Sequence, residues 1–266
     1  MSAPPADAVA EEVLGSPKYR HLDPDLVRFV AEKEAAAHPR LKEAVKAARS
    51  RLHQVAGAYR DGPAPYDAWL ADLRGSAADP AAFRAARRAV MTSHASTRER
   101  LPALDGFYRE LLGPLAPVRS VLDLGCGLNP LAIPEMPLAP GAEYVACDVD
   151  LDLLRFLSAW LPLAGVSGRA VPCNLARSCP EDEVDVALAL KLLPPLEQIE
   201  RGAGLRLLRS VRARAIVVSF PGQSLSGRKR GMGTHYAGRF LDSLSGERWS
   251  VRRLDFPAEV AFVLTG

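Results

Sequence analysis

Two closely spaced glycines follow a short apolar run in "SVLDLGCGLNP", residues 120–130. Glycine tolerates left-handed backbone conformations and lets the chain approach a ligand closely. A glycine-rich turn after a strand usually cradles a nucleotide-like molecule. Gly125 and Gly127 are therefore candidate ligand-binding residues.

The glycine spacing also limits which molecule can bind. A dinucleotide fingerprint has a third glycine, which allows close helix packing, whereas Pro130 stands in that region here. The G-K-[ST] end of a phosphate-binding P-loop does not occur either. A cofactor without phosphate groups remains, and S-adenosylmethionine fits that description.

Polar residues near the ends of three apolar runs support this cofactor. Asp148 closes "YVACDVD" about 20 residues after the turn, where an acidic residue typically holds ribose hydroxyls. Asn174 ends "VPCNL" and is placed to meet the adenine edge. Asp123, just before the turn, could reach the cofactor ammonium or order the loop. Asp148 or Asn174 alone would be an ordinary turn residue, but together the three predict a methyltransferase.

The elements that must position these residues change character near residue 117. Helical periodicity dominates before it, beginning with a helix capped by Asp23 and started by Pro24. After it, β-rich runs alternate with helical ones, which predicts a parallel sheet with right-handed crossovers. The last two runs have no helix between them and should pair as an antiparallel hairpin. The β-rich runs are "VRSVLDL", "EYVACDV", "GRAVPCNL", "VDVALAL", "ARAIVVSF", "WSVRRLDF" and "EVAFVLT".

The predicted architecture is therefore an α/β chain in two parts. Residues 1–117 form an all-helical N-terminal domain, and residues 118–266 form a Rossmann-like domain with a mixed, mostly parallel seven-stranded sheet. The opening "MSAPPADAVAEE" is expected to be a short disordered tail.

The composition is 48% apolar and 24% charged, which is ordinary for a soluble globular protein. No apolar run reaches the length of a membrane span, and no secretory signal is recognisable. We expect a cytoplasmic monomer. The four cysteines form no C-x-x-C pair and the histidines no H-x-x-x-H pair, so no metal site is expected.

Basic residues cluster although the net charge is only +3. Residues 40–60, 84–100 and 226–232 are each rich in basic residues. A solvated helix surface would explain any one of them, but three clusters favour an RNA partner. Arg84, Arg87 and Arg88 are candidate contacts in the second cluster.

The segments "HASTRERLP", "VLDLGCGLNP", "LALKLLPPLEQ" and "SFPGQSLSGRKRGM" together resemble the aminoglycoside-resistance 16S rRNA methyltransferases that modify N7 of guanosine 1405. The resemblance extends into the helical part at "RLHQVAGAY". It implies a class I methyltransferase domain that uses S-adenosylmethionine and acts on 16S rRNA within the 30S subunit.

The resemblance also implies roles for individual residues. Arg100 would pair with the cofactor carboxylate, a task that suits a bidentate guanidinium. The family commonly has Asp where this chain has Asn174, and the amide could still accept from the adenine amino group. The implied cofactor contacts are Tyr59, His94, Ala95, Ser96, Arg100, Gly125, Gly127, Asp148, Asn174, Leu175 and Leu190. Contacts to RNA are implied at Lys191, Arg228, Lys229 and Arg230.

This reaction needs no catalytic base, and none is expected here. Guanine N7 carries a lone pair and no proton, so the enzyme must only align it with the methyl group. RNA's deep major groove hides N7, so the base should be extruded. The helical domain would dock on the RNA, and the long loop over residues 220–236 would order over the flipped base.

Three alternatives remain from sequence. The target could be adenine N1 at a neighbouring decoding-site position, or a small molecule of an antibiotic pathway. The chain could also be a ribosome-binding protein without catalytic activity, although Gly125, Gly127, Asp148 and Arg100 argue against that.

Overall fold

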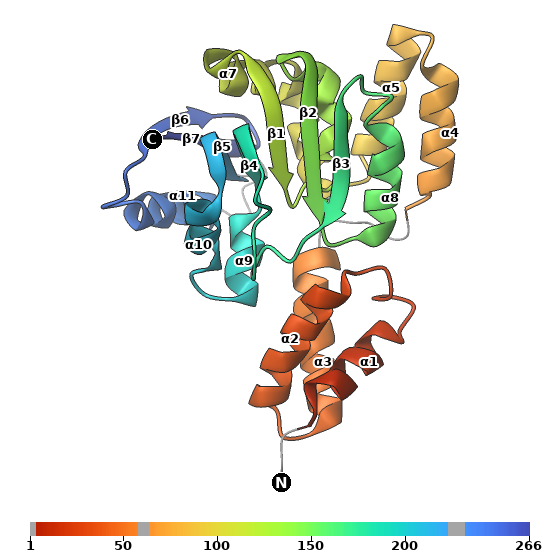
Figure 1. Ribbon diagram of the computed structural model, residues 1–266, viewed down its shortest axis with the longest axis vertical. Coiled ribbons are helices and arrows are strands. Elements are labelled where there is room, and N and C mark those ends of the chain that lie inside the picture. Colours follow the sequence, from red (N-terminus) through yellow and green to blue (C-terminus); the bar gives the residue numbers. More distant parts are fainter. Residues whose placement is uncertain (1–3, 58–63, 223–231) are drawn as a thin grey trace.

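The computed structural model describes residues 4–57, 64–222 and 232–266 and has a seven-stranded sheet at its centre. The strand order is β3-β2-β1-β4-β5-β7-β6 (Figure 1). The first five strands in this order are parallel, and β7 is antiparallel to both β5 and β6. The predicted fold class and terminal hairpin are therefore confirmed. The strands are β1 (Val118–Leu124), β2 (Leu138–Asp148), β3 (Ser167–Pro172), β4 (Glu183–Leu190), β5 (Arg212–Pro221), β6 (Ser250–Asp255) and β7 (Glu259–Thr265).

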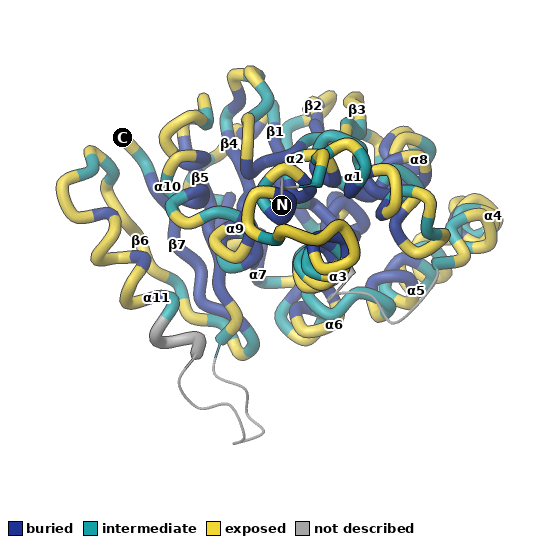
Figure 2. The backbone as a smooth tube through the Cα atoms, turned by 90° about the horizontal axis from the view of Figure 1, so that it is seen from below, coloured by how far each residue is buried: buried dark blue, intermediate teal, exposed yellow. Residues whose placement is uncertain are grey.

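Both faces of the sheet are buried, as expected for parallel strands with crossover helices. Neighbouring residues along a strand point to opposite faces, so Val121 joins one apolar cluster and Leu122 the other. The first cluster contains residues of α4 (Tyr66–Ser76), α5 (Pro80–Met91), α7 (Leu104–Leu112) and α8 (Leu151–Trp160). The second contains residues of α9 (Leu193–Ile199), α10 (Ala203–Ser210) and α11 (Met232–Ser243). Figure 2 shows the buried central strands and the more exposed helices.

Three N-terminal helices form a bundle below the sheet, α1 (Ala6–Leu14), α2 (Pro24–Ala37) and α3 (Leu41–Leu52) (Figure 1). Their buried side chains belong to the second apolar cluster. The expected cap is present, because the Asp23 side chain accepts from the backbone of Asp25 and Pro24 opens α2. The expectation of a disordered tail is wrong over α1. Val9 and Val13 are spaced for one helix face, and both are fully buried in the bundle.

The first 117 residues do not pack as one unit. Helices α4, α5 and α7 share one apolar cluster with the sheet, whereas α1–α3 pack on one another and join the apolar cluster on the other face. A short helix, α6 (Ala95–Arg100), and a 3-10 turn at Leu101–Ala103 lead into α7. Between β4 and β5 the chain forms two helices, α9 and α10, and Gly202, with a φ of 80°, directly precedes α10.

Shorter helical turns lie between the main elements. The π-helical turn His53–Gly57 extends α3, and 3-10 turns occupy Gly113–Leu115 and Asn129–Glu135. Residues 223–231 of the loop expected over 220–236 lie outside the described residues, and α11 already begins at Met232. No helix in the described part of the chain is long and apolar enough to cross a membrane.

Candidate cofactor site

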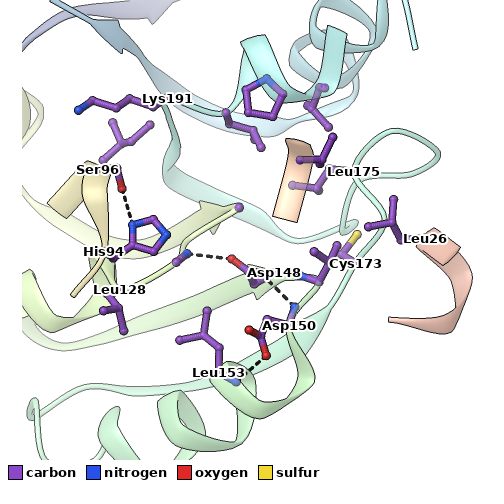
Figure 3. Close-up of a pocket in the computed structure, with 18 of the residues that line it drawn as sticks. Leu26, His94, Ser96, Leu128, Asp148, Asp150, Leu153, Cys173, Leu175 and Lys191 are labelled. Carbon is purple, nitrogen blue, oxygen red and sulfur yellow. Dashed lines mark hydrogen bonds between the residues drawn. The ribbon is translucent and has the colours of Figure 1, made fainter. Parts of the chain in front are cut away.

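A cavity of about 260 Å³ opens at the carboxyl ends of β1, β2 and β4. Figure 3 shows His94 and Ser96 on one wall, Leu26 and Leu175 on the other, and Asp148 between them. Among the predicted cofactor residues, those lining it are His94, Ser96, Gly125, Gly127, Asp148, Asn174, Leu175 and Leu190. Ala95 and Arg100 do not line it, and Tyr59 lies outside the described residues.

The glycine turn is shaped as its residue types require. Gly125 and Gly127 have φ angles of 60° and 50°, which side chains rarely adopt. A Cβ on Gly125 would lie 2.6 Å from Cδ1 of Leu192, and one on Gly127 would lie 3.1 Å from Nε2 of His94. The turn thus places bare backbone on the cavity wall, where a side chain would take up ligand space.

Asp148 closes β2 beside this turn. Its Oδ2 accepts from the backbone N–H of Gly127 at 2.9 Å, and its Oδ1 accepts from Val149 at 2.7 Å and Asp150 at 3.1 Å. Burial raises the pKa of the carboxyl above its ordinary value, and the bonds from Gly127, Asp150 and Val149 oppose that rise. Oδ1 already accepts two bonds, whereas Oδ2 accepts one and keeps acceptor capacity, so the carboxylate can also accept from a ribose hydroxyl.

Asn174 supplies a second polar group on the wall and is only 3% exposed. Its Nδ2 donates to Oδ2 of Asp25 at 3.1 Å. Its Oδ1 is buried and has no hydrogen-bond partner within the described residues. An unsatisfied buried acceptor costs stability, and an adenine amino group is a donor that would satisfy it. The residues present therefore fit an adenosine-containing cofactor.

The cavity wall also contains apolar residues that the sequence analysis did not identify. Tyr66 and Trp69 line it from α4, and both rings pack on Phe156, with Tyr66 stacked at 5.3 Å between centroids. Leu26 comes from α2 and Leu153 from α8. Their only sequence signal is helical periodicity, which does not separate a cavity wall from an ordinary core. On the opposite wall, Ser96 and His94 are hydrogen-bonded at 2.9 Å (Figure 3).

Arg100 lies in a buried polar cluster next to the cavity rather than on its lining. Its Nε donates to Oε1 of Glu259 at 2.5 Å and its NH1 to Oδ1 of Asn129 at 2.7 Å. Glu259 also accepts from Ser219 and lies 3.7 Å from Nζ of Lys191. Burial acts to raise the pKa of Glu259, but the charges of Arg100 and Lys191 and the hydrogen bonds from Arg100 and Ser219 together lower it below its ordinary value. The predicted contact of Arg100 with the cofactor carboxylate stays a prediction.

Lys191 differs from the expectation of an open RNA-facing side chain. It is 4% exposed, lines the cavity and has a φ of 56°. Its Nζ donates to Oε2 of Glu99 at 2.7 Å. A buried ammonium must be paired, and Glu99 and Glu259 provide the compensating charge.

Arg87 was predicted to contact RNA, but the structure buries its side chain. It is 3% exposed, and its guanidinium binds Glu135 at 2.7 and 2.9 Å and the carbonyl of Leu131 at 2.8 Å. These partners compensate a buried charge. Arg84 and Arg88 are more exposed and bind Asp105 at 2.5 and 3.3 Å. Arg228, Lys229 and Arg230 lie outside the described residues.

The mixed sheet, the left-handed glycine turn and the acidic residue that closes the next strand define a class I S-adenosylmethionine-dependent methyltransferase. Residues 15–263 match the family model described as "Ribosomal RNA methyltransferase (FmrO)". The chain belongs to this family.

Similar proteins extend over nearly the whole chain. A 16S rRNA (guanine(1405)-N(7))-methyltransferase of Micromonospora echinospora is 37% identical over 262 residues, covering 97% of this chain and 96% of that protein. One of Serratia marcescens is 37% identical over 235 residues, covering 88% of each. The crystal structure of the 16S rRNA methyltransferase RmtF in complex with S-adenosyl-L-homocysteine is 34% identical, with a TM-score of 0.83 and coverage of 98% and 97%. The 16S rRNA methylase RmtB is 29% identical, with a TM-score of 0.82 and 98% of each chain covered.

Proposed function

We infer that this protein transfers the methyl group of S-adenosylmethionine to N7 of guanosine 1405 in 16S rRNA and so confers aminoglycoside resistance. The observation that carries this function is the near-full-length identity of about 37% to relatives named for this reaction. The cavity supports it independently, because Asp148 and the free acceptor of Asn174 suit a ribose and an adenine. No observation on the described residues favours adenine N1 or a small molecule as the acceptor.

The cavity residues bind and orient the reactants and do not transfer protons. When bound, S-adenosylmethionine supplies an electrophilic methyl group on a sulfonium. Asp148 holds the ribose hydroxyls, Asn174 accepts from the adenine amino group, and the apolar wall of Tyr66 and Trp69 excludes water. Guanine N7 has no proton to lose, so no general base is needed, and the protein acts by aligning the reactants.

We further propose how the RNA is bound. Lys191, at the cavity wall, meets the flipped guanosine, while Arg84 and Arg88 meet phosphates outside. The expected RNA contacts of Arg228, Lys229 and Arg230 remain part of this proposal.

Residues 1–117 serve RNA docking and residues 118–266 serve the methyl transfer, with α4 and α5 also supporting the cavity. Phosphate contacts offset the cost of extruding the base, roughly a few kcal/mol. The enzyme acts as a monomer on the 30S subunit in the cytoplasm.

Drug susceptibility tests the inferred target. The wild-type protein and the Gly125→Ala variant are expressed in separate cultures of an aminoglycoside-sensitive bacterium. Modification of guanosine 1405 protects against drugs with the 4,6-linked sugar arrangement and leaves drugs without it effective. Protection that extends to both groups would favour the adenine target, and no protection from a well-expressed protein would contradict the proposed function.

A further inference from the structure

Asp25 connects the N-terminal bundle to the polar wall of the cavity. It is the second residue of α2, and its Oδ2 accepts from Nδ2 of Asn174, 149 residues further along the chain, at 3.1 Å. Two backbone bonds hold the same junction, from Asp23 to the Val149 carbonyl at 2.7 Å and from Leu151 to the His21 carbonyl at 2.8 Å. The bundle is thus fixed to the strand ends that form the cavity.

The chemistry of this pair determines which end of the Asn174 amide is free. A side-chain amide has a donating and an accepting end of nearly the same shape, so its neighbours select the orientation. An ionised carboxylate only accepts, so Asp25 selects the orientation that turns Nδ2 toward α2. The carbonyl Oδ1 is then the end left without a partner in the described structure.

Arg177 is a second side-chain partner of Asp25. Its NH1 lies 3.5 Å from Oδ1 of Asp25, on the oxygen that Asn174 does not use. The two oxygens of one carboxylate therefore have separate partners.

We propose that Asp25 is a positioning residue for cofactor recognition, which fixes the Asn174 amide so that its carbonyl oxygen accepts from the 6-amino group of adenine. This role rests on the proposed function, because it takes an adenine cofactor as given. It makes recognition depend on a residue of α2, outside the methyltransferase domain. A site fixed in this way prefers a 6-amino purine to a 6-oxo purine, since a carbonyl facing Oδ1 finds no donor.

Calorimetric titration with S-adenosylhomocysteine and its inosine analogue, S-inosylhomocysteine, tests the proposal. Wild type should prefer the adenine compound by roughly tenfold or more. In Asp25→Ala the amide can turn over and donate to the 6-oxo group, so the preference should fall by about three- to tenfold. Asp7→Ala is the matched control, because Asp7 is the exposed second residue of α1.

The outcomes distinguish the role of Asp25 from the proposed function. An unchanged preference in Asp25→Ala, with normal thermal unfolding, would overturn the role of Asp25 while leaving the methyltransferase intact. Failure of wild type to bind S-adenosylhomocysteine at all would overturn the proposed function and the role of Asp25 with it.

A charge exchange gives a second test that does not depend on truncation. Asn174→Asp places two carboxylates in contact and should weaken S-adenosylhomocysteine binding by about tenfold or more. Adding Asp25→Asn restores one donor and one acceptor to the pair, so affinity should return to within about threefold of wild type. If the double variant binds no better than Asn174→Asp, Asp25 does not position the amide.

Discussion

The backbone N–H of Gly127 donates a hydrogen bond of 2.9 Å to Oδ2 of Asp148. The two residues are 21 positions apart, and the parallel pairing of β1 with β2, which sets Leu124 opposite Cys147, brings them together. One carboxylate therefore closes the glycine turn and also faces the cavity. The shape of the turn and the recognition of the ribose depend on the same side chain.

Replacing that carboxylate by an amide should weaken cofactor binding. In Asp148→Asn one oxygen becomes a donor and can no longer accept a backbone N–H, so the turn loosens as the ribose contact weakens. We expect the dissociation constant of S-adenosylhomocysteine to rise by about tenfold or more, measured by calorimetry. Asp152→Asn is the control, since Asp152 lies nearby on α8 and pairs with Arg155 instead. Equal affinity in wild type and Asp148→Asn would contradict the ribose role.

Alanine substitutions can separate backbone strain from loss of ligand space at the glycine turn. Gly125 and Gly141 both have left-handed φ angles, but a Cβ meets Leu192 at Gly125 and open space at Gly141. Both variants should lose roughly 1–2 kcal/mol of stability in thermal unfolding. Only Gly125→Ala should also lose cofactor affinity, and a comparable affinity loss in Gly141→Ala would contradict this explanation.

Arg100 and Glu259 should behave as one buried pair in unfolding experiments. Arg100→Ala leaves a buried carboxylate without its main partner and should cost about 3–5 kcal/mol of unfolding free energy. Combining Arg100→Met with Glu259→Gln should cost less than the two single changes added together. Denaturant unfolding of wild type, of Arg100→Met, of Glu259→Gln and of the double variant measures the coupling. Strict additivity would show that the pair is not energetically linked.

The basic cluster on α5 should divide into structural and docking residues. Arg87→Ala removes the main partner of the half-buried Glu135, which keeps only Arg84 at 4.0 Å, and should destabilise the protein by about 3 kcal/mol. The double variant Arg84→Ala/Arg88→Ala should fold normally, bind S-adenosylhomocysteine normally, and bind 30S subunits more weakly with a shallower salt dependence. Filter binding at two salt concentrations measures this. Unchanged 30S affinity would remove these arginines from the docking surface.

Asp123 should give the protein a pH-dependent stability. Burial raises its pKa to about 6, although hydrogen bonds from Tyr144 and Asn129 act to lower it. The folded state then holds the proton more tightly than the unfolded state, so this contribution grows as pH falls through 6. Compared with Asp123→Asn, wild type should gain about 1 kcal/mol of unfolding free energy between pH 7.5 and 5. Parallel pH profiles of the two proteins would contradict the assignment.

The strands could be predicted from the sequence because their apolar runs are continuous and separated by clear helical runs. The glycine turn and Asp148 could be predicted because their spacing follows the parallel βαβ geometry. Both depend on local patterns along the chain.

Partners far apart in sequence could not be predicted in this way. Glu259 meets Arg100 across 159 residues, and Asp25 meets Asn174 across 149. Arg87 has the same sequence context as its exposed neighbours, and only the packing of α5 on the 3-10 turn Asn129–Glu135 shows that it is buried. Helix α1 was missed because the two prolines before it and its own alanines resemble those of a tail, whereas burial of Val9 and Val13 stabilises it.

Methyl transfer to isolated 30S subunits tests the central claim most directly. Subunits from an unmodified host are incubated with the protein and radiolabelled S-adenosylmethionine, and the 16S rRNA is treated with borohydride and aniline before primer extension. We predict incorporation of label and a single strong stop at guanosine 1405, with neither in the Gly125→Ala variant. Label at another nucleotide, or no label on subunits that fully active relatives modify, would contradict the account.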